Sequence, residues 1–249
     1  MSFALPLTTF GRVVAEISIV VPVYNEADNI LPLAQEVADA MSRQARSYEL
    51  LFVDDASTDE TWPRIQEAQR RDRRVRGLKH RQNSGQSAAL WTGLQNSSSP
   101  IVATLDGDLQ NDPADLPRLL AELEKVDFVS GKRLSRQDTF VRRASSKIAR
   151  WARRLILKVD FADTGCAMRA FKRSALEGVF PFNGLHRFLP ILVHGNGATT
   201  LEVPVNHRRR VAGVSKYGVW NRLGRGIYDL IALGWYQKRR LRPVPFTKS

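Results

Sequence analysis

Short runs of branched apolar residues alternate with longer amphipathic stretches through the first 131 residues of the chain. The run Ile17–Val23 carries a single polar side chain, Ser18, which is typical of a strand covered on both faces. Each later run is followed by a stretch with helical periodicity, so a strand–helix unit repeats along the chain. Repeated units of this length need right-handed crossovers, and the sequence therefore predicts an α/β protein with a mostly parallel, Rossmann-like sheet flanked by helices.

The expected elements can be placed along the chain from these runs. Strands are expected at 17–23, 49–54, 75–79, 100–105 and 127–131. Helices are expected at 25–41, 57–71, 85–95 and 113–124, with Ser57 or Thr58 at the start of the second helix and Asp59 as a capping side chain. After residue 131 the pattern loosens into a basic amphipathic helix, two short strand-like pieces and a mixed apolar and basic segment, expected at 142–158, 166–171, 200–207 and 219–241.

Charge is divided unevenly between the two halves of the chain. The 249 residues include 38 Lys and Arg against 25 Asp and Glu, a formal net charge of +13. Residues 1–131 hold 13 basic and 19 acidic side chains, whereas residues 132–249 hold 25 basic and 6 acidic ones. A basic half of this kind indicates an anionic partner, either nucleic acid or a phosphate-bearing membrane surface.

Composition excludes several classes of protein. With 43% hydrophobic and 25% charged residues, the chain is expected to be globular. The single cysteine, Cys166, excludes a disulfide framework and a zinc site built from cysteines. No run of about 18 uncharged apolar residues occurs, and residues 1–14 are too short and irregular for a secretory signal, so we expect a chain that does not cross a membrane.

Polar residues follow three of the expected strands, at 24–26, 54–55 and 106–110. In an open parallel sheet, ligands gather outside the carboxyl ends of the strands, so these residues mark the candidate site. Asp106 and Asp108 are separated only by Gly107, and two carboxylates so close repel each other unless a cation lies between them. Oxygen ligands of this type suit Mg²⁺ or Mn²⁺, which keep waters and bridge a substrate diphosphate. The pattern therefore predicts a divalent-cation site at Asp106 and Asp108.

Other catalytic motifs are absent from the sequence. There is no G-x-x-x-x-G-K-[ST] phosphate loop, no G-x-G-x-x-G after the first strand and no G-x-S-x-G elbow. The four histidines lack metal-binding spacing, and we expect most of them to be surface or packing residues; they are His80, His186, His194 and His207.

Eight ordered motifs resemble family-2 glycosyltransferases with the GT-A fold. The first four are VVPVYNE (20–26), VDDASTDET (53–61), NSGQSAAL (83–90) and LDGDLQ (105–110). The second four are GKR (131–133), RRASS (142–146), DTGCAMR (163–169) and RRVAGVSKYG (209–218). The second set is similar to the branch of dolichol-phosphate mannosyltransferases and related bacterial polyprenyl-phosphate glycosyltransferases.

The resemblance implies roles for residues of the donor site. Five residues match the positions that hold the nucleoside of a nucleotide sugar: Pro22, Tyr24, Glu26, Val53 and Asp55. Asp106, Gly107 and Asp108 match the motif that binds the metal and the diphosphate, with Gln110 as a further metal ligand. Arg210, Ser215 and Lys216 match the loop that closes over the diphosphate.

The resemblance also implies an acceptor site. Arg133, Arg142 and Ser146 match the positions that hold the phosphate of the acceptor lipid. On the expected helix Arg142 and Ser146 are four residues apart and share one face. Arg suits forked contact with phosphate, and Lys acts as a point charge. Asp106, Asp108, Arg133 and Arg142 are thus the predicted catalytic set.

An anionic acceptor simplifies the chemistry, because a polyprenyl phosphate needs no base to activate it. We expect in-line displacement with inversion, with a GDP- or UDP-sugar as donor and mannose favoured as the sugar. Asp163 is an alternative base, although capping of its loop or pairing with Arg169 would equally explain it. Two rivals remain: a family-2 transferase that uses a UDP-sugar and a hydroxyl acceptor, and a basic nucleic-acid-binding protein, which would leave Asp106 and Asp108 unexplained.

These expectations divide the chain into an N-terminal extension (1–15), a GT-A catalytic domain (16–218) and a basic amphipathic C-terminal segment (219–249). In the last segment, apolar residues including Ile231 and Trp235 could enter a membrane interface while the arginines after 238 meet anionic headgroups. Packing of this segment at the edge of the core is the alternative. We expect a cytoplasmic protein at the inner face of a membrane, with an anionic membrane surface and a separate anchoring subunit as partners and no nucleic acid.

Overall fold

The computed structural model describes residues 15–134, 154, 157, 159–208 and 219–240. Within these ranges the strands are β1 (Ile17–Val23), β2 (Tyr48–Asp54), β3 (Val75–Lys79), β4 (Ile101–Thr104), β5 (Phe128–Arg133), β6 (Arg169–Lys172) and β7 (Thr200–Val205). The helices are α1 (Ala27–Met41), α2 (Thr61–Arg71), α3 (Gln86–Gln95), α4 (Leu116–Glu122), α6 (Leu185–Gly195) and α7 (Val219–Arg239). Two short 3₁₀ helices are η1 (Pro113–Asp115) and η2 (Arg173–Leu176).

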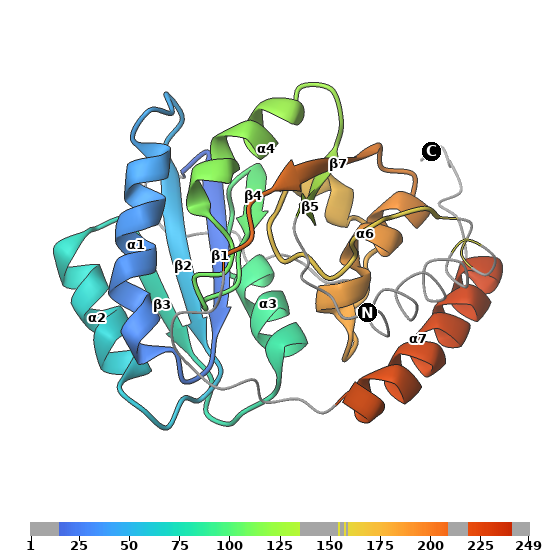
Figure 1. Ribbon diagram of the computed structural model, residues 1–249, viewed down its shortest axis with the longest axis horizontal. Helices are drawn as coiled ribbons and strands as arrows, with labels where there is room; N and C mark the ends of the chain where they lie inside the picture. The colour runs from blue at the N-terminus through green and yellow to red at the C-terminus, as the bar shows by residue number, and fades with distance from the viewer. Residues whose placement is uncertain (1–14, 135–153, 155–156, 158, 209–218, 241–249) are drawn as a thin grey trace, which may run out of the picture. The chain divides into compact units, whose positions relative to one another are not determined.

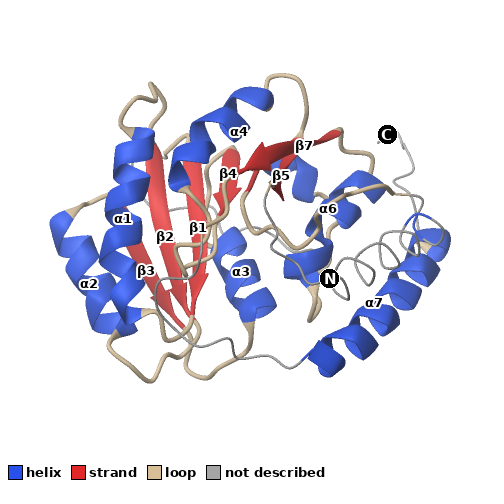
Figure 2. Cartoon of the chain, viewed as in Figure 1, coloured by secondary structure: helices blue, strands red, loops and turns tan. Residues whose placement is uncertain are grey.

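The seven strands form one sheet in the order β3-β2-β1-β4-β6-β5-β7. Strands β1 to β4 run parallel to one another, and β7 runs parallel to β5. Strand β6 is antiparallel to both of its neighbours, β4 and β5. The predicted α/β class, with a mostly parallel sheet flanked by helices, is confirmed (Figure 2).

Alternation along β1 shows why both faces of the sheet are apolar. Ile17, Ile19, Val21 and Val23 pack into one core with α1, α2 and α4. Val20 points the other way, toward Gly93 of α3. Helices α3 and α6 contact each other on this second face (Figure 1). Helices thus cover both faces of the sheet. Polar loops lie at the carboxyl ends of β1, β2 and β4, which is the edge of the sheet that the helices leave open.

The second expected helix begins later than the sequence suggested. It starts at Thr61 and not at Ser57 or Thr58. The amides of Ser57 and Thr58 are used elsewhere, because they donate to Oδ1 of Asp54 and Oδ1 of Asn25, both at 2.9 Å. The N-cap of α2 is Glu60 and not Asp59, although Asp59 Oδ1 accepts the amide of Thr61, the first residue of the helix, at 3.0 Å.

The described residues divide between two compact units. The larger unit holds the whole sheet, and the smaller one holds α7 together with the segment that ends at Phe161. In α7, Tyr228, Ile231 and Trp235 are 76%, 59% and 66% exposed, and their spacing places them on one helix face. In the part of the chain that the structure describes, no helix combines the length and the apolar character that a membrane crossing requires.

Candidate active site

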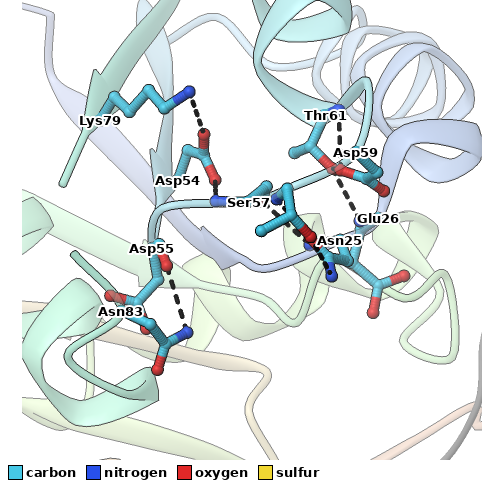
Figure 3. Close-up of polar contacts among 10 residues, drawn as sticks. Asn25, Glu26, Asp54, Asp55, Ser57, Asp59, Thr61, Lys79 and Asn83 are labelled. Atoms are coloured by element: carbon cyan, nitrogen blue, oxygen red, sulfur yellow. Dashed lines mark hydrogen bonds and ion pairs between the residues drawn. The ribbon is translucent and has the colours of Figure 1, made fainter. Parts of the chain in front are cut away.

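Hydrogen bonds join the loop after β1 to the loop after β2. Asn25 lies between them: its amide donates to Ser57 Oγ at 2.9 Å, and its Oδ1 accepts the amide of Thr58 at 2.9 Å. The amide of Glu26 donates to Thr61 Oγ1 at 2.8 Å. Figure 3 shows Asn25 and Glu26 facing the segment from Ser57 to Thr61 across this junction. The residues predicted to hold the nucleoside thus stand on a preorganised support.

Among the described residues, three that are not glycine adopt left-handed backbone conformations. They are Asn25 (φ 53°), Ala56 (φ 61°) and Leu109 (φ 59°). Each lies in a loop that follows the carboxyl end of a parallel strand. Because such conformations are strained for Ala and Leu and collect at functional sites, they support the placing of the site at this edge.

Asp55 organises the loop that leads into α3. Its Oδ1 accepts the amide of Ser84 at 2.9 Å and lies 2.7 Å from His80 Nδ1. Its Oδ2 accepts the amide of Gly85 at 2.7 Å. Asn83 donates through Nδ2 to the Asp55 carbonyl (Figure 3). The sequence indicates Asp55 and the motif at 83–90 separately, and the structure adds the hydrogen bonds that join them.

His80 is the residue of this network that sequence reasoning missed. Its Nε2 lies 2.9 Å from Thr92 Oγ1 on α3, so the ring connects Asp55 to that helix. The sequence predicts that most of the four histidines are surface or packing residues, whereas His80 belongs to a polar network. Its position immediately after β3 at the polar edge was the signal that could have marked it.

The Asp106–Gln110 loop lies beside this network. Gln86, the first residue of α3, donates through Nε2 to Asp106 Oδ1 at 2.8 Å. Asp108 is buried, and its Oδ1 accepts the Gln110 amide at 3.2 Å. A side chain at Gly107 would place its Cβ 2.5 Å from Val23 Cγ1 of β1, so only glycine lets the loop lie this close to the strand.

The donor set of this loop fits a divalent cation. In the described ranges no group of three or more His, Cys, Asp or Glu side chains could hold a metal. Mg²⁺ and Mn²⁺ at substrate phosphates need only one or two protein carboxylates, because waters and phosphate oxygens supply the rest. Asp106 and Asp108 provide that pair, and each is oriented by a hydrogen bond from the protein.

Residues that follow β7 fix the far end of the same loop. Arg208 and Gln110 exchange two hydrogen bonds, from the Arg208 amide to the Gln110 carbonyl at 2.8 Å and from Gln110 Nε2 to the Arg208 carbonyl at 3.4 Å. The Arg208 guanidinium pairs with Glu36 of α1 at 2.7 Å and with Asp112 at 2.8 Å. The hydrogen bond from Gln110 Nε2 orients the side chain, and Gln110 Oε1 is the atom that would act as a metal ligand, because hard cations take oxygen ligands.

Arg133 and Asp163 form a forked ion pair at the end of β5. Arg133 Nε lies 2.7 Å from Asp163 Oδ2, and Nη2 lies 2.8 Å from Oδ1. Burial alone would lower the pKa of Arg133, but the hydrogen bonds and charge of Asp163 outweigh it and raise the pKa. Asp163 also accepts the Gly165 amide, so it caps its loop. Its ion-pair partner is Arg133 and not Arg169, the partner that the sequence suggested.

Arg169 is buried beneath this pair. Its Nη2 donates to the carbonyls of Thr164 at 3.1 Å and His186 at 2.7 Å. Burial lowers its pKa to about 10, against the opposing charges of Asp106 and Asp163 among others. At neutral pH it remains a cation, so Arg133 and Arg169 bring two positive charges within electrostatic range of Asp106.

The remaining predicted residues divide into two groups. Within the described ranges, Pro22, Tyr24 and Glu26 are partly exposed at the open edge, whereas Val53 is fully buried with its side chain toward Gly93 of α3. Arg142, Ser146, Arg210, Ser215 and Lys216 lie outside the described residues. The structure thus brings together Asp55, the Asp106–Gln110 loop and Arg133.

A family model named Glycosyl transferase family 2 matches residues 18–180. The chain belongs to this family and is a glycosyltransferase, as the eight motifs predicted. The dodecaprenyl-phosphate galacturonate synthase of Rhizobium johnstonii is 36% identical over 240 residues, which cover 94% of this chain and 71% of that protein. An undecaprenyl-phosphate 4-deoxy-4-formamido-L-arabinose transferase of Pseudomonas fluorescens is 37% identical over 86% of this chain and 64% of its own length. The resemblance to the polyprenyl-phosphate branch is confirmed.

Solved structures share the fold at low sequence identity. Glucosyl-3-phosphoglycerate synthase from Mycobacterium tuberculosis, in complex with Mn²⁺, UDP and phosphoglyceric acid, superposes with a TM-score of 0.64 at 20% identity, over 94% of this chain and 87% of that one. A mannosyltransferase from Pyrobaculum calidifontis, in complex with GDP-mannose and Mn²⁺, gives a TM-score of 0.63 at 20% identity, over 93% and 66%. These likenesses confirm the GT-A fold.

Proposed function

We propose that the chain transfers a sugar from a nucleotide sugar to a polyprenyl phosphate, with inversion at the anomeric carbon. The observation that carries the proposal is the arrangement of charge around Asp106. Asp106 and Asp108 form a pair of carboxylates suited to a cation, and the charge of Asp106 acts to raise the pKa of both Arg133 and Arg169, so the two guanidinium groups lie within electrostatic range of it. The names of the two relatives, both polyprenyl-phosphate sugar transferases, support the same acceptor.

The acidic residues of the second half favour an acceptor that is already ionised. A hydroxyl acceptor needs a carboxylate that can take its proton. In the described part of the larger unit, the acids after residue 131 are Asp163, Glu177 and Glu202. Asp163 is paired with Arg133, Glu202 accepts two backbone amides, and Glu177 is exposed at the end of η2. This distribution supports phosphate over hydroxyl.

The chain's own groups then have three tasks. Arg133 would receive the acceptor phosphate by forked hydrogen bonds, as guanidinium groups commonly do. Asp106 and Asp108, with Gln110, would hold a divalent cation, which when bound would neutralise the charge of the departing diphosphate. The interlocked loops after β1 and β2 would keep the nucleoside fixed, so that the reacting atoms meet without further reorganisation.

Uridine is the nucleoside that this site supports best. An ionised carboxylate offers about four lone-pair positions, and Asp55 already accepts from Ser84 and Gly85 and meets His80. One position, on Oδ2, is left. Uracil presents a single ring N–H, whereas guanine presents two donors on one edge and needs both carboxylate oxygens. We therefore place UDP-sugars ahead of GDP-sugars, and mannose stays a prediction that the names of these relatives do not support.

Helix α7 supports the further proposal of a peripheral membrane location. Tyr228, Ile231 and Trp235 form an exposed apolar stripe, and Lys238 and Arg239 follow in the last turn. Apolar residues beside cations suit an anionic membrane surface. The cytoplasmic face and a separate anchoring subunit belong to this proposal as well.

The test is a transfer assay with matched acceptors. The chain is incubated with Mn²⁺ or Mg²⁺, UDP-galacturonate, UDP-glucose or GDP-mannose, and either undecaprenyl phosphate or undecaprenol. We expect a lipid-linked product of inverted configuration when the donor is a UDP-sugar and the acceptor is undecaprenyl phosphate. We expect no product from undecaprenol, and none when a chelator is present. Transfer to undecaprenol, or no transfer to the phosphate from any donor, would contradict the proposal.

A further inference from the structure

The acceptor arginine is held by a carboxylate that has no capacity left for chemistry. From the residues that the structure describes, Asp163 accepts four hydrogen bonds on its two oxygens. Arg133 supplies three of them, from Nε, Nη2 and its own amide, and the amide of Gly165 supplies the fourth. Four is about the number of lone-pair positions that a carboxylate offers. A substrate proton would therefore have to displace an existing bond.

The same pair leaves Arg133 able to bind a phosphate. A guanidinium group has five N–H donors, and the side chain of Asp163 uses two of them. The other three, including both on Nη1, remain for a substrate. The Arg133 side chain is 14% exposed, so it has little freedom to find another orientation.

The position of Asp163 is in turn fixed by Glu202 of β7. Glu202 Oε1 accepts the Asp163 amide at 2.9 Å, and Oε2 accepts the amide of Ala162 at 2.7 Å. Glu202 pairs in register with Ser130 of β5, three residues before Arg133. One carboxylate on the strand next to β5 thus fixes the backbone that carries the second carboxylate.

We propose that Glu202 and Asp163 are positioning residues for the acceptor phosphate, and that they act through Arg133. Glu202 holds the 162–163 backbone, Asp163 holds the guanidinium, and Arg133 meets the phosphate. Asp163 takes no proton in the reaction. The inference rests on the proposed function, because it assigns these residues to the acceptor of that reaction.

The experiment measures steady-state kinetics separately in acceptor and donor for Asp163→Asn and Glu202→Gln. The glutamine retains one acceptor oxygen but presents N–H donors to the second backbone amide, so one of the two hydrogen bonds is lost. Both variants should raise KM for undecaprenyl phosphate by about tenfold, with KM for the donor unchanged and kcat within about threefold of wild type. The matched control is Glu177→Gln, an exposed carboxylate at the end of η2, which should behave as wild type.

A double-mutant cycle separates positioning from proton transfer. If Asp163 acts through Arg133, Asp163→Asn should change the acceptor KM and kcat little when Arg133→Met is already present, because the two residues act as one unit. A general base would instead lower kcat by about 10²–10⁴-fold, leave KM for the acceptor unchanged, and multiply the loss in the double variant. That result would overturn the inference, whatever Glu202→Gln does.

The outcomes also distinguish this inference from the proposed function. No lipid-linked product from the wild-type chain would remove both. If the wild type forms product but the folded Glu202→Gln variant has an unchanged KM for undecaprenyl phosphate, the positioning role is wrong and the proposed function still stands. Thermal unfolding of each variant establishes folding, and if Glu202→Gln does not fold, the cycle of Arg133 and Asp163 still decides between the two roles.

Discussion

Gly107→Ala should disable the metal loop through one steric contact. The new Cβ would lie 2.5 Å from Val23 Cγ1, whereas ordinary contacts of this kind are 3.4–4 Å. The loop or the strand must therefore move by about 1 Å, because a valine in a strand has few alternative rotamers. A displacement of about 1 Å in a catalytic group can cost about 10²-fold in rate.

The stability cost of this substitution can be estimated in the same way. Overpacking of a core contact typically costs about 1–3 kcal/mol, which in a chain of this size lowers Tm by roughly 5 °C. We expect Gly107→Ala to fold and to lose about 100-fold in kcat/KM for the nucleotide sugar. The assays are differential scanning fluorimetry and initial rates of transfer at subsaturating donor.

Removal of the opposing methyl groups should restore the loop. Apart from Val23 Cγ1, the nearest atoms to the new Cβ are Val23 Cβ at 3.5 Å and the Pro22 carbonyl oxygen at 3.6 Å, both ordinary contacts. Val23→Ala alone should lower the free energy of unfolding by about 2 kcal/mol, because Val23 is buried. It should change the transfer rate little. The double variant should return to within about threefold of the Val23→Ala rate. Full activity in Gly107→Ala, or no recovery in the double variant, would refute the steric argument.

Three further outcomes are expected. Asp108→Ala should abolish transfer and Mn²⁺-dependent nucleotide binding by calorimetry while the far-ultraviolet circular dichroism is unchanged, and retained turnover would contradict its metal role. Hydrogen bonds from Thr199 and Lys172 lower the pKa of Asp127 from 3.8 to about 2, so its ionised form stabilises the fold above pH 4 and that contribution is lost as the pH falls through 2. With its partial exposure taken into account, Asp127→Asn should cost about 1 kcal/mol in urea unfolding at pH 7, and an equal difference from wild type at pH 2 would contradict this origin. Burial raises the pKa of Cys166 to about 11, so a disulfide reagent at pH 8 should react with it only after denaturant is added, and rapid reaction of the native protein would disprove its burial.

Local pattern was sufficient to predict the donor half of the sheet. Strands such as β1 and β3 were placed at their observed bounds, because a strand buried on both faces is a continuous apolar run between polar turns. The same reasoning placed the Asp106–Gln110 loop at the open edge. The error at the start of α2 arose because Ser57 and Thr58 bind Asp54 and Asn25, and the Asn25 contact spans more than 30 residues of sequence.

The acceptor half depends on contacts that local pattern does not contain. Strand β6 is only four residues long and runs antiparallel between β4 and β5, an order set by pairing across the sheet. Asp163 lies 30 residues from Arg133 in sequence, and Arg169 is closer to it, so spacing alone pointed to the wrong partner. The buried position of Arg169, held by two backbone carbonyls, has no local sequence signature.

In the described sheet, the strand order places β4 next to β6, so the two halves of the sheet meet along the one short ladder between these strands. The ladder between β4 and β6 contains four register pairs, from Ile101 with Lys172 to Thr104 with Arg169. The residues predicted to bind the nucleoside and the metal all precede β5 in the chain, and Arg133, predicted to bind the acceptor phosphate, ends β5. A chimera that joins this chain between α4 and β5 to a relative with another acceptor would therefore have to preserve these four pairs and the contacts of Arg208 with Gln110, Glu36 and Asp112. The junction between β4 and β6 is therefore a place at which glycosyltransferases with exchanged acceptor specificity can be constructed.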